Sequence, residues 1–135
     1  MFVSEFKMRV RYGETDQMGY MYHGNYAQYY EVGRVEALRQ LGTSYKALEE
    51  EGVMMPVLEI QSKFIRPALY DDEITIRTML RELPKARVSF EFELLDESGN
   101  LLHTATVHLA FVRASDMRPI RCPQSLLEVF KPYFT

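Results

Sequence analysis

The sequence predicts an α+β domain in which one long helix is wrapped by a bent, mainly antiparallel sheet of about five strands. Apolar residues recur at helical spacing over residues 25–42, and they alternate with polar residues over most of the chain after Gly52. The connections between the expected strands are too short for parallel crossovers, so neighbouring strands should be antiparallel. No linker, repeat or low-complexity tract interrupts the 135 residues, and we expect a single domain over residues 1–135.

The first strand should end beside a glycine-rich loop. Phe6, Met8 and Val10 alternate with basic residues, which is the two-residue period of a half-buried strand. The segment that follows is rich in glycine and has little apolar periodicity. We therefore expect Asp16 on a loop between this strand and the long helix.

The long helix has recognisable start and stop signals. Asn25 followed by Gln28 resembles a capping box, and Gly42 supplies the left-handed residue that ends many helices. Arg34 falls off the apolar stripe, one turn from Glu31, and should form an intrahelical or an interface ion pair. The stripe itself consists of Tyr26, Tyr30, Gly33, Ala37 and Leu41.

The rest of the chain is expected to be mostly sheet after a short helix over residues 44–50. Pro56 interrupts the first strand-like run, 53–64, and predicts a bent or bulged beginning. Residues 96–100 are a clear hairpin connection. Further strands are expected at 74–80, 88–94 and 101–112, and a closing helix at 123–130.

Charge and composition exclude several classes of function. The formal net charge is −3 and the pI is near 5.6, with Lys and Arg scattered among acidic residues, so a nucleic-acid partner is not expected. No run approaches the ~18 to 20 apolar residues that cross a bilayer, so neither membrane insertion nor export is expected. The single cysteine, Cys122, excludes an internal disulfide and favours a reducing compartment, and the cytoplasm is the expected location.

The two histidines of the last long strand should point to opposite faces. His103 and His108 are separated by an odd number of positions, and side chains alternate between the faces of a strand. They therefore cannot bind one metal ion together. We expect both to be core or interface residues, and we expect neither a metal nor a cofactor.

Asp16 and the start of the long helix have the composition of a small active site. A helix start carries unpaired backbone N–H groups and about half a positive charge. It can stabilise a carbonyl oxygen that becomes negative during acyl transfer. The backbone N–H groups of His23 and Gly24 are expected in this role, while Asp16 would act as nucleophile or as general base. These residues suggest hydrolysis of an activated acyl group.

One motif runs through the first third of the chain: Tyr12-x-x-Thr15-Asp16-x-x-Gly19-x-x-x-His23-x-x-Tyr26, continued by Glu31, Arg34 and Gly42. This motif resembles that of the 4-hydroxybenzoyl-CoA thioesterase family, and the turn at residues 66–68 is also similar to that family. The order of strand, Asp loop, helix and consecutive strands resembles the hotdog fold of that family. The similarity spans nearly the full chain.

The resemblance implies hydrolysis of an acyl-coenzyme A thioester in the cytoplasm by a homodimer or homotetramer with sites at subunit interfaces. It places the catalytic carboxylate on Asp16 and implies that Tyr12 and His23 cooperate with it. Tyr26 would be a core residue or a wall of the acyl pocket. The acyl group could be carried by coenzyme A or by an acyl-carrier protein, and we favour a medium or long chain.

Coenzyme A would need cationic partners for its phosphates at the mouth of the site. The candidates are Lys63, Arg66, Lys85 and Arg87, although Lys and Arg at strand ends and turns are more often simply solvated. The sequence contains no glycine-rich phosphate loop of the G-x-x-x-x-G-K type.

Other classes of function stay open. An Asp in a glycine-rich loop is most often a turn former or a helix cap, so the chain could be a non-catalytic hotdog protein that binds acyl-CoA or an acyl carrier. A hydratase or dehydratase ranks third, because Asp16 precedes His23 by seven positions, unlike the tighter spacing usual in those enzymes. In each class the tyrosine-rich helix and open sheet edges favour an oligomer.

Overall fold

The computed structural model describes residues 1–134. The helices and strands are β1 (Phe2–Arg9), α1 (Tyr26–Gln40), α2 (Tyr45–Glu50), β2 (Val53–Met54), β3 (Val57–Phe64), β4 (Glu73–Leu80), β5 (Arg87–Leu95), β6 (Leu101–Ala110), β7 (Val112–Arg113) and α3 (Gln124–Phe130). Short 3₁₀ turns lie at Tyr12–Glu14, His23–Asn25 and Lys131–Tyr133. No helix within residues 1–134 is long and apolar enough to cross a membrane.

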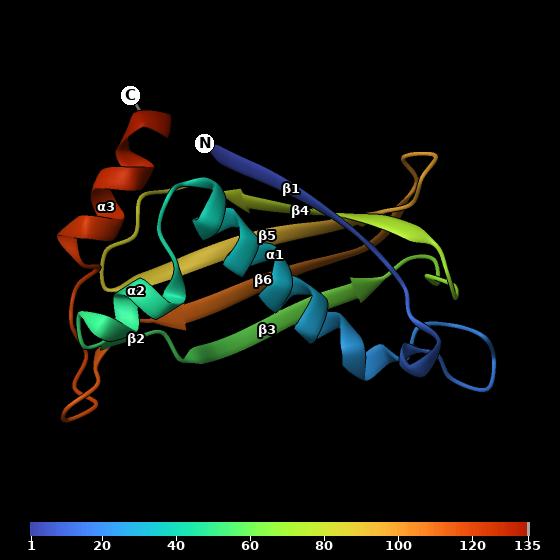
Figure 1. The fold of residues 1–135 in the computed structure, drawn as a ribbon, viewed down its shortest axis with the longest axis horizontal. Helices are drawn as coiled ribbons and strands as arrows, with labels where there is room; N and C mark the ends of the chain where they lie inside the picture. Colours follow the sequence, from blue (N-terminus) through green and yellow to red (C-terminus); the bar gives the residue numbers. More distant parts are fainter. Residues whose placement is uncertain (135) are drawn as a thin grey trace.

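Five antiparallel strands form the main sheet in the order β1-β4-β5-β6-β3 (Figure 1). The α+β prediction, with one long helix and an antiparallel sheet of about five strands, is thereby confirmed. The strand-like run is interrupted at Pro56, as predicted. The short strand before it, β2, pairs with β7 in a small second sheet that the sequence pattern does not predict. The hairpin at 96–100 joins β5 to β6, and α2 and α3 lie where short helices are predicted.

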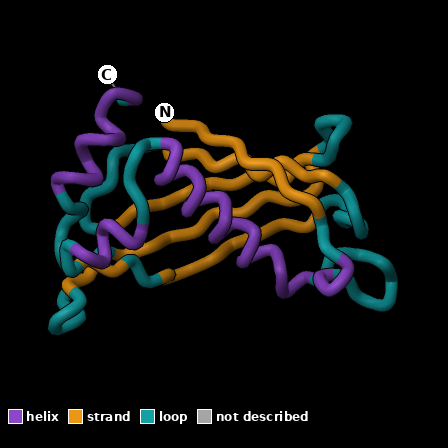
Figure 2. Tube along the Cα trace, viewed as in Figure 1, coloured by secondary structure: helices purple, strands orange, loops and turns teal. Residues whose placement is uncertain are grey.

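α1 crosses one face of the main sheet and contacts β1 and β4 (Figures 1 and 2). The helix comes close to the sheet at Gly33, where a Cβ atom would lie 2.7 Å from Cγ2 of Ile76 and 2.9 Å from Oγ1 of Thr78. These separations are shorter than side chains tolerate, so the absence of a side chain at Gly33 permits the close packing. The core lies between this helix face and the inward-facing side chains of the strands.

The predicted capping box at Asn25 is wrong. Asn25 has helical backbone dihedrals, φ −87° and ψ −15°, and within residues 1–134 its side chain caps no N–H of α1. Its Nδ2 instead donates to the backbone oxygen of Glu14 at 2.9 Å. The predicted helix end is confirmed, because Gly42 has φ +85° and the N–H of Thr43 donates to the oxygen of Leu38 at 3.0 Å.

Arg34 is buried, with 8% of its surface exposed, so its expected place off the apolar stripe is wrong. It lies four residues after Tyr30 and three before Ala37, which places it at the edge of the buried face of α1. Among the residues that the structure describes, it forms no ion pair with Glu31 or with any other acid. Its Nε has no hydrogen-bond partner in this part of the chain either. The intrahelical ion pair is therefore not formed, which leaves the interface ion pair as the alternative.

His103 and His108 point to opposite faces of β6, as predicted. His103 is fully buried beneath α1. Its Nδ1 lies 2.5 Å from the hydroxyl of Tyr30 in a hydrogen bond, and its ring stacks on Tyr26 at a centroid distance of 4.3 Å. Burial lowers the pKa of His103 to about 4, so the imidazole is neutral. His108 lies on the outer face, where Nδ1 is 2.7 Å from Oγ of Ser89.

We predict that the protein loses stability when His103 is forced to protonate. The folded-state pKa of about 4 lies below the unfolded value of about 6.5. The unfolded chain therefore binds the proton first, and the free energy of unfolding falls as the pH drops through that interval. The slope from this residue is at most about 1.4 kcal/mol per pH unit.

The free energy of unfolding, measured with urea at about pH 7 and about pH 5, should fall more between these two pH values in the unmodified chain than in His103→Gln. His108→Gln is the matched control on the same strand, and it should keep the full pH dependence. Equal pH dependence in the unmodified chain and in His103→Gln would contradict the prediction.

Candidate active site

Asp16 lies in a closed turn that its own side chain helps to hold. Its Oδ1 accepts the backbone N–H groups of Met18 at 2.9 Å and Tyr20 at 3.2 Å. Its backbone N–H donates to the oxygen of Tyr20 at 2.8 Å, and Gly19 donates to the oxygen of Asp16 at 3.0 Å. Gly19 has φ +79°, a conformation that favours glycine, so the D-x-x-G sequence fixes this turn.

A second turn in the molecule has the same hydrogen bonds. Oδ1 of Asp96, in the hairpin between β5 and β6, accepts the N–H groups of Ser98 at 2.9 Å and Asn100 at 2.8 Å. Gly99 has φ +83° and donates to the oxygen of Asp96 at 3.0 Å. The hydrogen bonds of Asp16 are therefore those of an ordinary D-x-x-G turn, and they do not by themselves identify a catalytic residue.

The surroundings of Asp16 distinguish it from Asp96. A cavity of about 250 Å³ lies between the Asp16 turn, the start of α1 and the segment that follows β3. It brings together four of the residues predicted for the site: Asp16, His23, Tyr26 and Arg66. The remaining walls are mostly apolar and consist of Met18, Tyr20, Met21, Phe64, Ile65 and Pro67.

The helix start beside this cavity offers free hydrogen-bond donors. A 3₁₀ turn, His23–Asn25, precedes α1 directly. Within residues 1–134 the backbone N–H groups of His23 and Gly24 donate to no acceptor. Because such groups and the helix dipole attract negative charge, this end of the cavity could hold a developing oxyanion.

Tyr26 presents a protonated phenol to the same cavity. Burial raises its pKa, a hydrogen bond from the Ala68 backbone opposes the shift, and the negative charge of Asp16 raises the pKa further. The ring packs edge to face against Phe64 at a centroid distance of 5.1 Å. Tyr26 is therefore a wall of the cavity, and its phenol stays protonated beside the charge of Asp16.

Tyr12, predicted to assist Asp16, is not brought to this cavity within the chain. Its side chain is 77% exposed and packs edge to face against Tyr70 at 5.5 Å. The backbone oxygen of Tyr12 accepts the hydroxyl of Thr15 at 2.7 Å, which ties the residue to the turn through its main chain.

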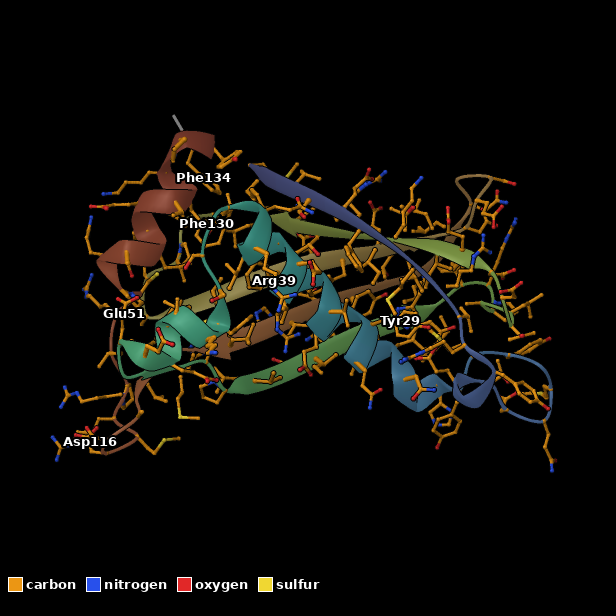
Figure 3. All side chains as sticks on the ribbon, viewed as in Figure 1. Tyr29, Arg39, Glu51, Asp116, Phe130 and Phe134 are labelled. Atoms are coloured by element: carbon orange, nitrogen blue, oxygen red, sulfur yellow. The ribbon has the colours of Figure 1, made fainter. Side chains whose placement is uncertain are left out.

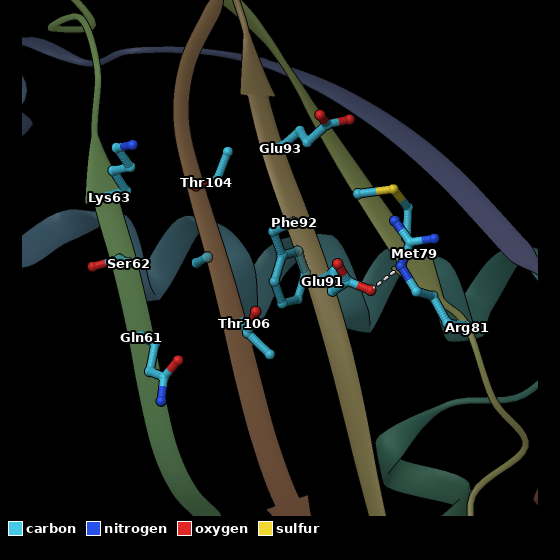
Figure 4. A pocket seen from close by; sticks show the side chains of 11 residues that line it. Gln61, Ser62, Lys63, Met79, Arg81, Glu91, Phe92, Glu93, Thr104 and Thr106 are labelled. Atoms are coloured by element: carbon cyan, nitrogen blue, oxygen red, sulfur yellow. Dashed lines mark hydrogen bonds and ion pairs between the residues drawn. The ribbon is translucent and has the colours of Figure 1, made fainter.

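The predicted coenzyme A contacts are divided among different cavities. Arg66 lines the Asp16 cavity. Lys63 lies on the outer face of the sheet, in a shallow polar cavity of about 500 Å³ that β3, β4, β5 and β6 line (Figure 4). Arg87 lines a third cavity, of about 310 Å³. Of these three cations, Arg66 is therefore the one placed beside Asp16.

Glu14 has a part in the site that the sequence did not predict. The residue is 9% exposed, and its carboxylate accepts the backbone N–H of Arg11 at 2.8 Å and the hydroxyl of Tyr29 at 2.5 Å. Burial alone would raise the pKa of Glu14, but the hydrogen bonds from Arg11 and Tyr29 outweigh it, and the pKa is lowered. The available signal was a second acid two positions before Asp16, in a segment otherwise typical of a turn.

Comparison with known proteins agrees with this arrangement. The sequence profile of the Thioesterase-like superfamily matches residues 10–130. The acyl-CoA thioester hydrolase YbgC of Escherichia coli O6:H1 is 32% identical over 124 residues, which cover 92% of this chain and 92% of the relative. The acyl-CoA thioesterase YbgC of Haemophilus influenzae is 32% identical over 126 residues, covering 93% and 92%.

Solved structures share the whole fold. A DHNA-CoA thioesterase from Staphylococcus aureus superposes with a TM-score of 0.92 at 29% identity, over 98% of this chain and 91% of that one. The hypothetical protein TT1821 from Thermus thermophilus gives a TM-score of 0.89 at 32% identity, over 96% and 98%. The predicted hotdog fold is thus confirmed. Because the profile and the relatives both extend across the helix and the sheet, this chain belongs to the Thioesterase-like superfamily.

Proposed function

We propose that this protein hydrolyses an acyl-coenzyme A thioester, with Asp16 as its catalytic carboxylate. The observation that carries the proposal is the cavity that Asp16 and His23 line together. The naming of relatives with 32% identity as acyl-CoA thioester hydrolases also supports it. The motif resembling the 4-hydroxybenzoyl-CoA thioesterase family supports placing the chain in that branch of the superfamily.

The geometry suggests how the bond would be broken. Only Oδ1 of Asp16 accepts hydrogen bonds from the described residues, so Oδ2 is available to the substrate or to water. It would attack the thioester carbon directly or remove a proton from the attacking water. The carbonyl oxygen, negative in the intermediate, would face the N–H groups of His23 and Gly24. The carbon–sulfur bond then breaks, and coenzyme A leaves as a thiolate without the help of a general acid. On the direct route the acyl group stays on Asp16 as a mixed anhydride, which water then hydrolyses to the free acid; on the water route the free acid forms at once.

We predict that Asp16→Asn reduces kcat by at least about 100-fold on acyl-CoA thioesters. The amide oxygen of Asn can still accept the N–H groups of Met18 and Tyr20, so the turn is kept while the charge is lost. A panel of acyl-CoA thioesters, with a colorimetric reagent for the released thiol, measures the loss.

The matched control is Asp96→Asn, because Oδ1 of Asp96 holds a turn of the same kind and Asp96 does not line the Asp16 cavity. It should change kcat by less than about twofold. Similar losses in both variants would mean that the turn, and not the carboxylate, supports activity.

The alternative is a non-catalytic protein that binds acyl-CoA or an acyl carrier. The hydrogen bonds of Asp16 Oδ1, which are also found in the ordinary turn at Asp96, favour this alternative. The unmodified chain decides between the two: a binder would show a higher melting temperature with acyl-CoA and release no thiol.

We further propose that Arg66 binds a phosphate of coenzyme A. It lines the Asp16 cavity and forms no ion pair within residues 1–134. Arg66 also lines a neighbouring cavity with Asp72, Asp96 and Glu97, so a phosphate would compete with these acids for its guanidinium. The acyl group would then lie against the apolar walls that Tyr26 and Phe64 provide.

We predict that Arg66→Ala raises KM for acyl-CoA about tenfold and leaves KM unchanged for the same acyl group on N-acetylcysteamine, which has no phosphate. Lys63 and Arg87 line other cavities, so Lys63→Ala and Arg87→Ala should each change KM for acyl-CoA by less than about twofold. A larger effect at Lys63 or Arg87 than at Arg66 would show that coenzyme A follows a different path over the surface.

We also propose that the protein is a homo-oligomer in which a second copy covers β3. Every residue of this edge strand is exposed, and its apolar members include Val57, Leu58, Ile60 and Phe64. An open apolar edge strand is a template for pairing with another chain. The buried Arg34, which lacks an acid within residues 1–134, agrees with a partner that supplies one. We place the protein in the cytoplasm, which the single cysteine favours.

We predict that Ile60→Lys shifts the protein to the monomer in size-exclusion chromatography with light scattering, because a charge would be buried where the edges pair. Val3→Lys is the matched control: Val3 lies on β1, the opposite edge of the sheet, and is 45% exposed against 44% for Ile60. It should leave the assembly intact. A monomeric unmodified chain, or dissociation by Val3→Lys alone, would be incompatible with this proposal.

A further inference from the structure

Glu14 connects the loop that carries Asp16 to the first turns of α1. Its Oε1 accepts the hydroxyl of Tyr29 at 2.5 Å, and Tyr29 lies on the N-terminal half of α1 (Figure 3). The same oxygen accepts the N–H of Arg11 at 2.8 Å, and Oε2 accepts Nη2 of Arg11 at 3.1 Å. All these bonds are made by a buried carboxylate, where hydrogen bonds to charged groups are strongest.

The main chain of Glu14 makes two more connections at the same place. Its oxygen accepts the N–H of Tyr22 at 2.8 Å and Nδ2 of Asn25 at 2.9 Å. Tyr22 and Asn25 flank His23 and Gly24, whose backbone N–H groups donate to no acceptor within residues 1–134. A single residue therefore fixes both ends of the His23–Asn25 turn.

Asp16 is attached to this anchor over only two residues. Its turn is closed locally by the bonds to Met18 and Tyr20, so the turn would move as a unit. The far side of the turn is held by the bridge between Tyr20 and Leu69 and by the N–H of Met21, which donates to the oxygen of Ala68 at 2.7 Å. The bonds at Glu14 join the near side of that unit to the start of α1.

We propose that Glu14 is a positioning residue that sets the distance between the Asp16 carboxylate and the amides of His23 and Gly24. This inference rests on the proposed function of the same site. Glu14 does not line the Asp16 cavity, so it acts through Asp16 and not on the substrate. Its lowered pKa keeps it a carboxylate, and therefore an acceptor, at neutral pH.

The test compares Glu14→Leu, Tyr29→Phe and the double variant with the unmodified chain. Leu removes both acceptor oxygens, whereas the amide oxygen of Gln could still accept the hydroxyl of Tyr29. Displacement of reacting groups by about 1 Å can cost about 100-fold in rate, so we expect Glu14→Leu to lower kcat by about 10- to 100-fold. KM should stay within about twofold, because the walls that bind the substrate are unchanged. Tyr29→Phe, which keeps the ring and removes the donor, should lower kcat by a smaller factor. The double variant should be no worse than Glu14→Leu, because Tyr29→Phe breaks a bond that Glu14→Leu already breaks.

The matched control is Glu36→Leu, which removes an acid of α1 and its ion pair with Arg39, 2.6 Å, away from the loop. It should leave kcat within about twofold. Hydrogen exchange gives a readout that does not depend on catalysis: amides of residues 14–25 should exchange at least about tenfold faster in Glu14→Leu and Tyr29→Phe, and not in Glu36→Leu.

The outcomes separate this inference from the proposed function. An unmodified chain that releases no thiol from any thioester refutes the proposed function, while the exchange measurement still reports on Glu14. Folded Glu14→Leu or Tyr29→Phe with unchanged kcat, a loss confined to KM, additive losses in the double variant, or unchanged exchange over residues 14–25 would each overturn the positioning role.

Discussion

The arrangement of the site depends on the hydrogen bonds that join the Tyr12–Glu14 turn to the first two turns of α1. A loop and a helix start can each form from local sequence alone, but nothing local sets the distance between them. The buried carboxylate of Glu14 supplies that constraint, because it accepts the hydroxyl of Tyr29 and the main chain of Arg11 together. Burying a charge is costly unless it is fully hydrogen-bonded. The arrangement in which Glu14 keeps all of its hydrogen bonds is therefore lower in free energy than arrangements in which it loses one.

The two D-x-x-G turns show why local chemistry is not enough to make a site. Oδ1 of Asp16 and Oδ1 of Asp96 accept backbone N–H groups at the same positions along the chain, and each turn has a glycine with nearly the same φ. The two residues differ in the cavities that they line. Asp96, whose Oδ2 also accepts Nδ2 of Asn100, lines a cavity with Asp72 and Glu97, whereas the cavity of Asp16 is bounded by a helix start. The fold therefore turns a common turn into a candidate catalytic centre by placing donors across from it.

The sequence could predict those parts of the fold that depend on local periodicity. The strands alternate as expected, and Ser44, at the start of the predicted short helix, accepts the N–H of Ala47 at 3.0 Å. Asn25 fails as a capping residue because a distant acceptor, the oxygen of Glu14, takes its side chain. The predicted intrahelical ion pair of Arg34 is absent for a similar reason, because the burial of Arg34 depends on what covers that side of α1.

Within the site, the sequence placed Asp16, His23, Tyr26 and Arg66 in one region, and the structure brings all four to one cavity. Their grouping was predictable because three of them belong to one short motif. The direction of a side chain was not predictable in the same way. Tyr12 is in the same motif but points to solvent within this chain. Alternation assigns a strand residue to a face, but it cannot say which face a cavity will adjoin, and so Lys63 and Arg87 lie elsewhere.

The inner wall of the cavity is continuous with the hydrophobic core, and this limits how the site can change. Tyr26 lines the cavity with one side of its ring and stacks on the buried His103 with the other. His103 in turn hydrogen-bonds with Tyr30 and contacts Phe64 edge to face at 4.5 Å. Because core side chains are close-packed, a substitution at any of these positions displaces the others. A substitution in this wall that enlarges the cavity for a bulkier acyl group would therefore also lower the stability of the protein. The outer walls are formed by Met18 and Tyr20 on an exposed loop, and substitutions there would change stability little.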